Sequence, residues 1–249
     1  MCKEGSVKAD LTLQETLGAL RGYLEELIET GVDGLPLATG GETPETALPG
    51  MVSGASPEPG METLADIRLE LGECRRCSLG EGRTNLVFGV GNPHARLVFV
   101  GEAPGRDEDL RGEPFVGEAG QLLTNIIQAM GFERSEVYIC NVLKCRPPNN
   151  RDPQPAEVEA CGSFMFRQVR AIGPQVVVAL GRFAAQTLLS TKAPISQLRG
   201  QFHDYHGIPL MPTYHPAALL RDASLKRDVW DDMKQVMKAL GKEVKGKGK

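Results

Sequence analysis

The sequence predicts an α/β fold in which a parallel β-sheet is covered by helices on both faces. Four short apolar runs, at 96–101, 136–142, 175–180 and 209–215, have the composition of strands, and helix-like segments follow the first three. Strands that alternate with helices favour a parallel sheet, because each helix carries the chain back to the same end of the sheet. The near-continuous Val, Ile and Leu content of these runs is typical of strands that are buried on both faces.

The chain begins with an extension, residues 1–62, that we expect to be largely disordered. Apolar residues recur at helical spacing within it and predict one amphipathic helix over about 10–31. A stretch rich in Gly, Pro, Ser and Thr follows and is typical of a disordered linker. A lone helix cannot bury its apolar face against itself, so we expect it to dock on the body, bind a protein partner or stay partly unfolded.

The body is predicted to occupy residues 63–241. Helical segments follow its first three strands at 120–131, 155–173 and 182–190, and a terminal helix is expected at 228–241. The last residues, 242–249, are rich in lysine and glycine and predict a basic disordered tail.

The charge and hydropathy of the sequence limit the ligands and the cellular location that we expect for the protein. Residues 1–62 hold eleven acidic and three basic side chains (−8), and the remainder holds twenty-one acidic and twenty-five basic ones (+4). A mildly basic body is compatible with nucleic acid as a ligand, although many enzymes carry such a charge. No run of eighteen apolar residues and no secretory leader is present, so we expect a cytoplasmic protein without a membrane span.

The cysteines are candidate metal ligands. Cys74 and Cys77 form a C-x-x-C pair that precedes the first strand, which argues against a redox pair between a strand and a helix. Cys145 and Cys161 are sixteen residues apart, and one close pair with two scattered thiolates suits either zinc or an iron–sulfur cluster. Small buried thiols are the alternative interpretation. Cys140 lies within an apolar strand and is a poor ligand, as is the terminal Cys2.

The ligand site of such a sheet lies at the carboxyl ends of its strands. The first strand runs into the turn Gly101–Gly105, which lacks the residues of a phosphate-binding or dinucleotide-binding loop. Carboxylates crowd this turn and suit either the orientation of water or a solvated surface loop; they are Glu102, Asp107, Glu108 and Asp109. Asn141 ends the second strand and His215 the fourth. Phe115 lies on a loop bounded by Gly and Pro and either plugs the core or stacks on a flat ligand.

Five blocks of sequence then carry a family resemblance. They are VFGVGNP (87–93), GEAPGRDED (101–109), GEPFVGEAGQLL (112–123), VYICNVLKCRPPNNRDP (137–153) and YHPAALLR (214–221). In this order they resemble a family 4 uracil-DNA glycosylase, over roughly residues 70–240. The resemblance implies a three-layer α/β/α fold with a four-stranded parallel sheet, a monomer, and removal of uracil from DNA to leave an abasic site.

The resemblance also implies a cofactor and a set of roles. Cys74, Cys77, Cys145 and Cys161 match the ligands of a structural [4Fe–4S] cluster. In the pocket, Phe115 would stack on the extruded base and Asn141 would read its edge, while His215 would hydrogen-bond the charge developing at uracil O2. The backbone of the turn with Gly101 and Ala103 would assist.

The sequence leaves open which residue positions the water and whether the protein is an enzyme. Ala103 stands where the better-known uracil glycosylases carry a water-positioning aspartate, which leaves Glu102 and Glu108 as candidates, and Glu108 is also a candidate for the wall that excludes the methyl group of thymine. A non-catalytic iron–sulfur DNA-binding or polymerase-associated module, or a small electron-transfer protein, is the alternative function.

Overall fold

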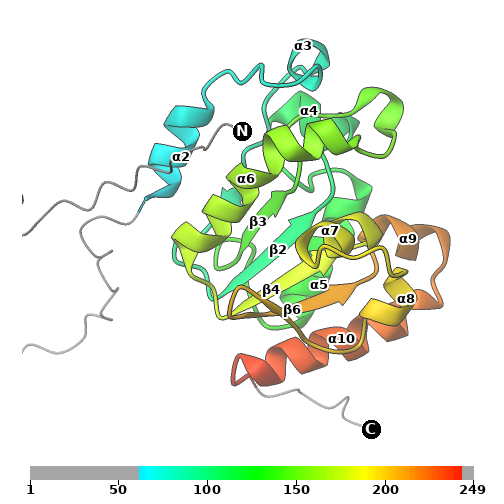
Figure 1. Ribbon diagram of the computed structural model, residues 1–249. Helices are drawn as coiled ribbons and strands as arrows, with labels where there is room; N and C mark the ends of the chain where they lie inside the picture. The colour runs from blue at the N-terminus through cyan, green and yellow to red at the C-terminus, as the bar shows by residue number, and fades with distance from the viewer. Residues whose placement is uncertain (1–61, 243–249) are drawn as a thin grey trace, which may run out of the picture. The chain divides into compact units, whose positions relative to one another are not determined.

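The computed structural model describes residues 62–242, and the predicted extension helix, its linker and the tail beyond Lys242 lie outside the described residues. The described body is built on one six-stranded sheet with the order β1-β3-β2-β4-β6-β5 (Figure 1). Its centre consists of four parallel strands, β2 (Leu97–Gly101), β3 (Tyr138–Asn141), β4 (Val176–Leu180) and β6 (Ile208–Thr213). The predicted parallel α/β sheet is confirmed.

The expectation of four strands is wrong because two short strands extend the sheet at its edges. β1 (Val90–Gly91) pairs antiparallel with β3, and β5 (His203–Tyr205) pairs antiparallel with β6. Strands of two or three residues carry no readable alternation. The β5–β6 hairpin turns at His206 and Gly207, where φ is 52° and 83°, and a glycine in such a turn was its only sequence signal.

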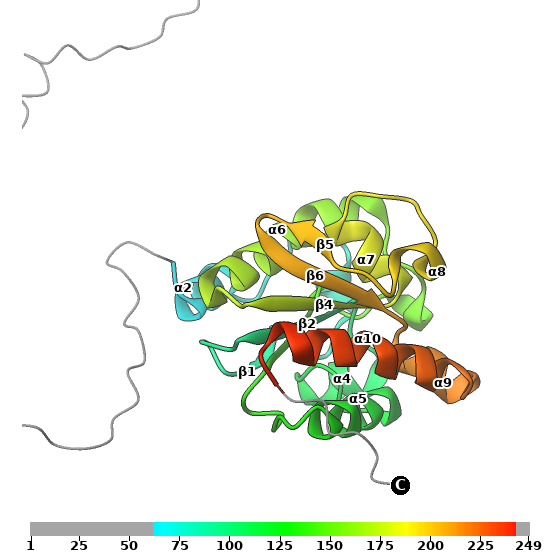
Figure 2. The same ribbon diagram turned by 90° about the horizontal axis from the view of Figure 1, so that it is seen from below.

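Helices form a layer on each face of the sheet, which confirms the three-layer architecture (Figure 2). One face carries α6 (Pro155–Ile172), α7 (Arg182–Leu188) and α8 (Ile195–Leu198). The other carries α5 (Glu118–Ala129), α9 (Pro216–Arg221) and α10 (Leu225–Ala239). Shorter or peripheral elements are α2 (Leu64–Leu71), α3 (Leu79–Gly82), α4 (Arg106–Arg111) and the 3-10 turn Pro148–Asn150. Among the described helices, none is long and apolar enough to cross a membrane.

Each face of the sheet has its own apolar core, as the alternation of β2 shows. Leu97 and Phe99 are buried in a cluster with residues of α5 and α10. Val98 and Val100 are buried in a second cluster with residues of α6 and α7. Because successive strand residues point to opposite faces, an all-apolar strand supplies both cores at once.

The helix α2 is fixed on α6 by a third, smaller apolar cluster. Ile67 and Leu71 of α2 are buried against Phe164 of α6. Thr63 begins the helix, since its hydroxyl accepts a hydrogen bond from the backbone N–H of Asp66 at 3.2 Å. Burial of one such side chain adds about 1.5–3 kcal/mol to the stability of the fold, so these apolar contacts supply most of the energy that holds α2 on α6.

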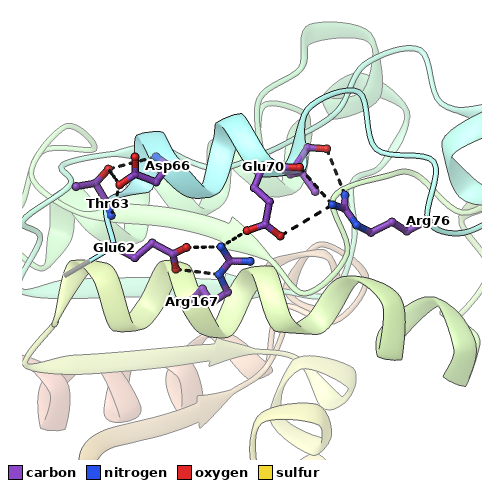
Figure 3. A network of polar contacts seen from close by, with 7 residues as sticks. Glu62, Thr63, Asp66, Glu70, Arg76 and Arg167 are labelled. Atoms are coloured by element: carbon purple, nitrogen blue, oxygen red, sulfur yellow. Dashed lines mark hydrogen bonds and ion pairs between the residues drawn. The ribbon is translucent and has the colours of Figure 1, made fainter. Parts of the chain in front are cut away.

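A polar network joins the same two helices at the surface (Figure 3). Arg167 of α6 binds the carboxylates of Glu62 and Glu70, and Glu70 also faces Arg76 at 3.9 Å. The guanidiniums of Arg76 and Arg167 lie 5.0 and 5.4 Å from the ring centre of Phe164. Half-exposed ion pairs contribute little, so this network mainly fixes the position of α2. The segment that follows α2 lies next to this network, and its Cys74 packs against the same apolar cluster.

Candidate active site

A cavity of about 460 Å³ opens at the carboxyl ends of β2, β3 and β6. The chain passes from β2 to β3 on one side and then returns to β4 on the other, so the sheet reverses its order at β2. Such a reversal leaves a crevice where ligands bind in open α/β sheets. The residues that line it are Glu102, Ala103, Pro104, Gly105, Glu108, Phe115, Ala119, Asn141, Pro147, Asn150, Arg151, His215, Ala217 and Arg221.

Asn141 ends β3 and places its side-chain amide in the cavity wall. The residue is 2% exposed. Among the described residues, its Oδ1 is the one buried side-chain oxygen or nitrogen that has no hydrogen-bond partner. A buried acceptor without a partner costs about 1–3 kcal/mol, so such an atom is retained where a ligand supplies the donor.

Gly101 and Phe115 pack against Asn141. A Cβ at Gly101 would lie 2.3 Å from Asn141 Oδ1 and 2.6 Å from the Phe115 ring, so only glycine fits there. Gly101 is not among the residues that line the cavity, and its lack of a side chain makes room for the Asn141 amide and the Phe115 ring. Phe115 is 6% exposed and adopts φ 54°, a rare conformation for an aromatic residue. Its ring both belongs to the core and lines the cavity.

His215 follows β6 and is the N-cap of α9, where Pro216 is the first helical residue. Its Nδ1 accepts the backbone N–H of Ala217 at 3.1 Å, so its hydrogen is carried by Nε2. Burial lowers the pKa of His215 to about 4, and the charge of Arg221 acts in the same direction. The ring is therefore neutral near pH 7, and its centre lies 5.5 Å from that of Phe115.

The two glutamates of the cavity differ in what they bind. Glu108 accepts the backbone N–H groups of Gly105, Val116 and Gly117 at 3.1, 2.9 and 3.0 Å. Its carboxylate thus joins the turn after β2 to the loop that carries Phe115. No donor within residues 62–242 binds the carboxylate of Glu102, which is half-buried. Burial, with the charge of Asp152 adding, raises the pKa of Glu102 above its usual value.

The other acids of this turn lie outside the cavity. Asp109 is buried, and its Oδ1 accepts the backbone N–H groups of Thr84 and Asn85 at 2.9 and 3.3 Å. Asp107 lines a separate, smaller hollow beside Val116. Of the four carboxylates that are close together in the sequence, Glu102 and Glu108 therefore line the cavity. Asp109 supports the loop at Thr84, and Asp107 borders the smaller hollow.

The four predicted cysteine ligands come from three segments. Cys74 and Cys77 follow α2, Cys145 follows β3, and Cys161 lies on α6. The pKa of the Cys145 thiol is raised by burial to about 11, with Cys161 and Cys77 adding to the rise, and the pKa of Cys161 is raised by burial, with Cys77 and Cys74 adding. Cys77 and Cys161 pack against the same apolar cluster that contains Cys145. Cys140, by contrast, is fully buried within β3.

Hydrogen-bond donors surround three of these sulfurs. Arg76 approaches Cys74 Sγ at 3.4 Å, Arg83 approaches Cys145 Sγ at 3.4 Å, and the backbone N–H of Lys144 approaches Cys161 Sγ at 3.3 Å. Such donors favour thiolates over thiols. Within the part of the chain that the structure describes, no group of three or more histidine, cysteine or acidic side chains converges closely enough to hold a single metal ion.

Sequence reasoning missed several residues of this region. Arg151 and Arg221 line the cavity and supply its positive charge. The guanidinium of Arg151 is held by two hydrogen bonds to Glu157, at 2.9 and 2.6 Å. Both arginines lie within blocks that carried the family resemblance, but nothing in their spacing distinguished them from surface arginines.

Comparisons with known proteins show the family of the chain. The sequence model of the uracil DNA glycosylase superfamily matches residues 88–234. The type-4 uracil-DNA glycosylase of Archaeoglobus fulgidus is 49% identical over 191 residues, which cover 74% of this chain and 96% of the relative. The type-4 uracil-DNA glycosylase of Thermotoga maritima is 47% identical over 69% of this chain and 91% of its own. That of Sulfurisphaera tokodaii is 43% identical over 71% and 84%.

Proposed function

The chain belongs to the uracil DNA glycosylase superfamily and is a uracil-excising enzyme of DNA repair, and we propose that the cavity at the ends of β2, β3 and β6 reads and releases the base. A base within a duplex is out of reach, so the uracil nucleotide must first be extruded from the stack. The ring of Phe115 then lies against the face of the base.

The unpartnered Oδ1 of Asn141 is the observation that carries this proposal. Uracil offers a donor at N3 and an acceptor at O4, and the Asn141 amide can accept the first and donate to the second. Cytosine carries an acceptor and a donor at the same two atoms. In a complex with cytosine, buried polar groups of both the amide and the base would lack partners. Such a mismatch lowers kcat/KM by about 10⁴-fold or more.

His215 stabilises the leaving group without protonating it. When the oxygen of water bonds to C1′ of the sugar and the C1′–N1 bond breaks, the electron pair of that bond passes to uracil. The resulting anion concentrates charge at O2, where the neutral imidazole donates its Nε2 hydrogen. A ring whose pKa lies at about 4 is a poor source of protons at neutral pH, so its role is electrostatic.

Glu102 positions the attacking water, and Glu108 holds the wall of the cavity. The free carboxylate of Glu102 can orient a water molecule and accept its proton, which then passes to solvent. The carboxylate of Glu108 already binds three backbone N–H groups and has little capacity left for water. Arg151 and Arg221 lie at the same cavity and suit the phosphates beside the extruded nucleotide.

Cys74, Cys77, Cys145 and Cys161 hold a [4Fe–4S] cluster in this proposal. The donors that approach three of these sulfurs support their assignment as thiolate ligands, and the match of all four cysteines to the cluster ligands of the family favours the cluster over zinc. The cluster serves as a structural link between α6 and the segments that follow α2 and β3.

The test of function uses the purified protein and an oligonucleotide with one uracil. Excision leaves an abasic site, which alkali converts to a strand break at that position. We expect breakage with uracil and none with cytosine or thymine in its place, and Asn141→Ala should abolish it. Absence of breakage in both single-stranded and duplex uracil substrates would refute the proposed function.

A further inference from the structure

Beyond the cavity, the core beneath Asn141 contains a buried lysine that the proposed mechanism does not use. Lys144 is fully buried, three residues after Asn141 in the chain. Its Nζ donates to the backbone carbonyl of Asn141 at 2.8 Å and to the side-chain oxygen of Gln168 on α6. Among residues 62–242, the two oxygens that accept hydrogen bonds from this amine are both uncharged. A lysine is seldom buried without a carboxylate, because desolvation of the amine is costly, so its hydrogen bonds need an explanation.

Side chains add to the strand pairing on this edge of β3. β1 pairs with β3 only at Tyr138 and Ile139, so the ladder on that edge ends before Asn141. Beyond this point the Phe88 carbonyl accepts from Gln168 Nε2 at 3.0 Å, and Gln168 in turn accepts from Lys144. Two side chains therefore join the segment at Phe88 to the end of β3, beside the backbone hydrogen bond that the N–H of Val87 donates to the carbonyl of Lys144 at 2.8 Å. We refer to the hydrogen-bonded series Phe88–Gln168–Lys144–Asn141 as the side-chain bridge.

Hydrogen bonds hold the backbone at Asn141 from two sides, and the side-chain bridge supplies those on one side. On the β2 side, the N–H groups of Val142 and Leu143 donate to the carbonyls of Gly101 and Glu102 at 2.9 and 3.0 Å. On the other side, the carbonyl of Asn141 itself is held by Lys144. The direction of a side chain follows from its backbone, so both sets of contacts set where the Asn141 amide points.

We propose that Lys144 is a positioning residue for base recognition, which holds the backbone of Asn141 so that its amide meets the edge of uracil. This inference rests on the proposed function and adds a residue that does not touch the base. The backbone N–H of Lys144 also donates to Cys161 Sγ, so the same residue contacts both the cysteine site and the residue that reads the base.

The test compares Lys144→Met with Ile139→Val. Methionine keeps the length of the chain but removes both donors of the amine. Ile139 lies on β3 with Asn141, is fully buried and belongs to the apolar core beneath α5 and α10, so its shortening lowers stability without removing a hydrogen bond of the side-chain bridge. Free uracil is titrated into each folded protein by calorimetry, well below its melting temperature, and affinity for undamaged duplex DNA is measured in parallel.

We expect Lys144→Met to bind free uracil about tenfold more weakly than the wild type, the effect of one lost hydrogen bond at the reading residue. Affinity for undamaged DNA should not change, because phosphate contacts dominate it. Ile139→Val should match the wild type in both measurements. Uracil affinity of Lys144→Met equal to that of Ile139→Val would overturn the proposal and assign Lys144 to stability alone.

The same measurements also cover a Lys144→Met variant that does not fold and a wild-type protein that is inactive. If Lys144→Met does not fold, Gln168→Met removes the second acceptor of the amine and leaves Lys144 bonded to Asn141. It should weaken uracil binding by a smaller factor, and an unchanged affinity would overturn the proposal. A wild-type protein that neither excises nor binds uracil would refute the proposed function itself, whatever the variants do.

Discussion

The protonation of His215 gives the sharpest prediction of the proposed mechanism. With its pKa lowered to about 4, the ring binds a proton only in acid well below the range in which an ordinary histidine titrates. At pH 5 about one tenth of the molecules would carry an imidazolium, whereas a histidine with the usual pKa of 6.5 would be about 97% protonated. Between pH 8 and pH 5 the neutral fraction thus falls by about a tenth in the first case and about thirtyfold in the second.

The assay must separate His215 from Glu102, which also titrates on the acid side. The pKa of Glu102 is raised, so its carboxylate takes up a proton at a higher pH than an ordinary glutamate and the wild-type rate should fall on that limb. In Glu102→Gln this limb is removed. Single-turnover rates of that variant, measured from pH 8 to pH 5, should then stay within about twofold. The His215 ring is followed directly by NMR over the same range.

Removal of a charge provides the internal control. Arg221 helps to lower the pKa of His215, so Arg221→Gln should raise it and move the onset of ring protonation to higher pH. A thirtyfold fall in the rate of Glu102→Gln between pH 8 and pH 5, or an NMR titration of His215 centred near pH 6.5, would refute the assignment of a neutral hydrogen-bond donor.

The remaining predictions concern the reading residue, the water, the packing and the cysteines. Asn141→Asp should weaken uracil excision and admit slow cytosine excision, measured by alkali cleavage of the two oligonucleotides; equal uracil rates would remove Asn141 from the pocket. Glu102→Gln should lower the single-turnover rate at pH 8 by about 10²-fold or more, as the loss of a general base does; an unchanged rate would assign the water elsewhere. Gly101→Ala should destabilise by about 1–3 kcal/mol in denaturant unfolding, because its Cβ would lie 2.3 Å from Asn141 Oδ1. Cys145→Ser should lose iron and melt at lower temperature, whereas Cys140→Ser should retain iron; stoichiometric zinc without iron would contradict the cluster.

The sequence was sufficient for the centre of the sheet and for the residues at its strand ends. The four parallel strands were readable because β2 and β4 are apolar on both faces, and a buried strand leaves no other pattern. The edge strands β1 and β5 were not readable, since two or three residues contain no period. The predicted fourth strand was also extended too far, to His215, because the sequence does not show that β6 ends at Thr213.

The sequence indicated which residues lie at the cavity better than it indicated what each of them does there. Glu102 and Glu108 are indistinguishable in the sequence, and only the hydrogen bonds that the backbone N–H groups of Val116 and Gly117 donate to Glu108 separate the two carboxylates. Lys144, beside a cysteine in a polar loop, has the sequence context of a surface lysine. Its burial depends on Gln168 on a distant helix, a contact that no local pattern encodes.

The acceptor on Asn141 also makes the stability of the folded protein a measure of what occupies its cavity. A compound that brings an N–H group to this oxygen binds the folded form, and any such ligand stabilises it by about 2.7 kcal/mol at one hundred times its dissociation constant. Melting temperature thus becomes a reporter of cavity occupancy. Planar imides should raise it, whereas analogues methylated at the equivalent nitrogen should not, which offers a route to inhibitors that requires no DNA substrate.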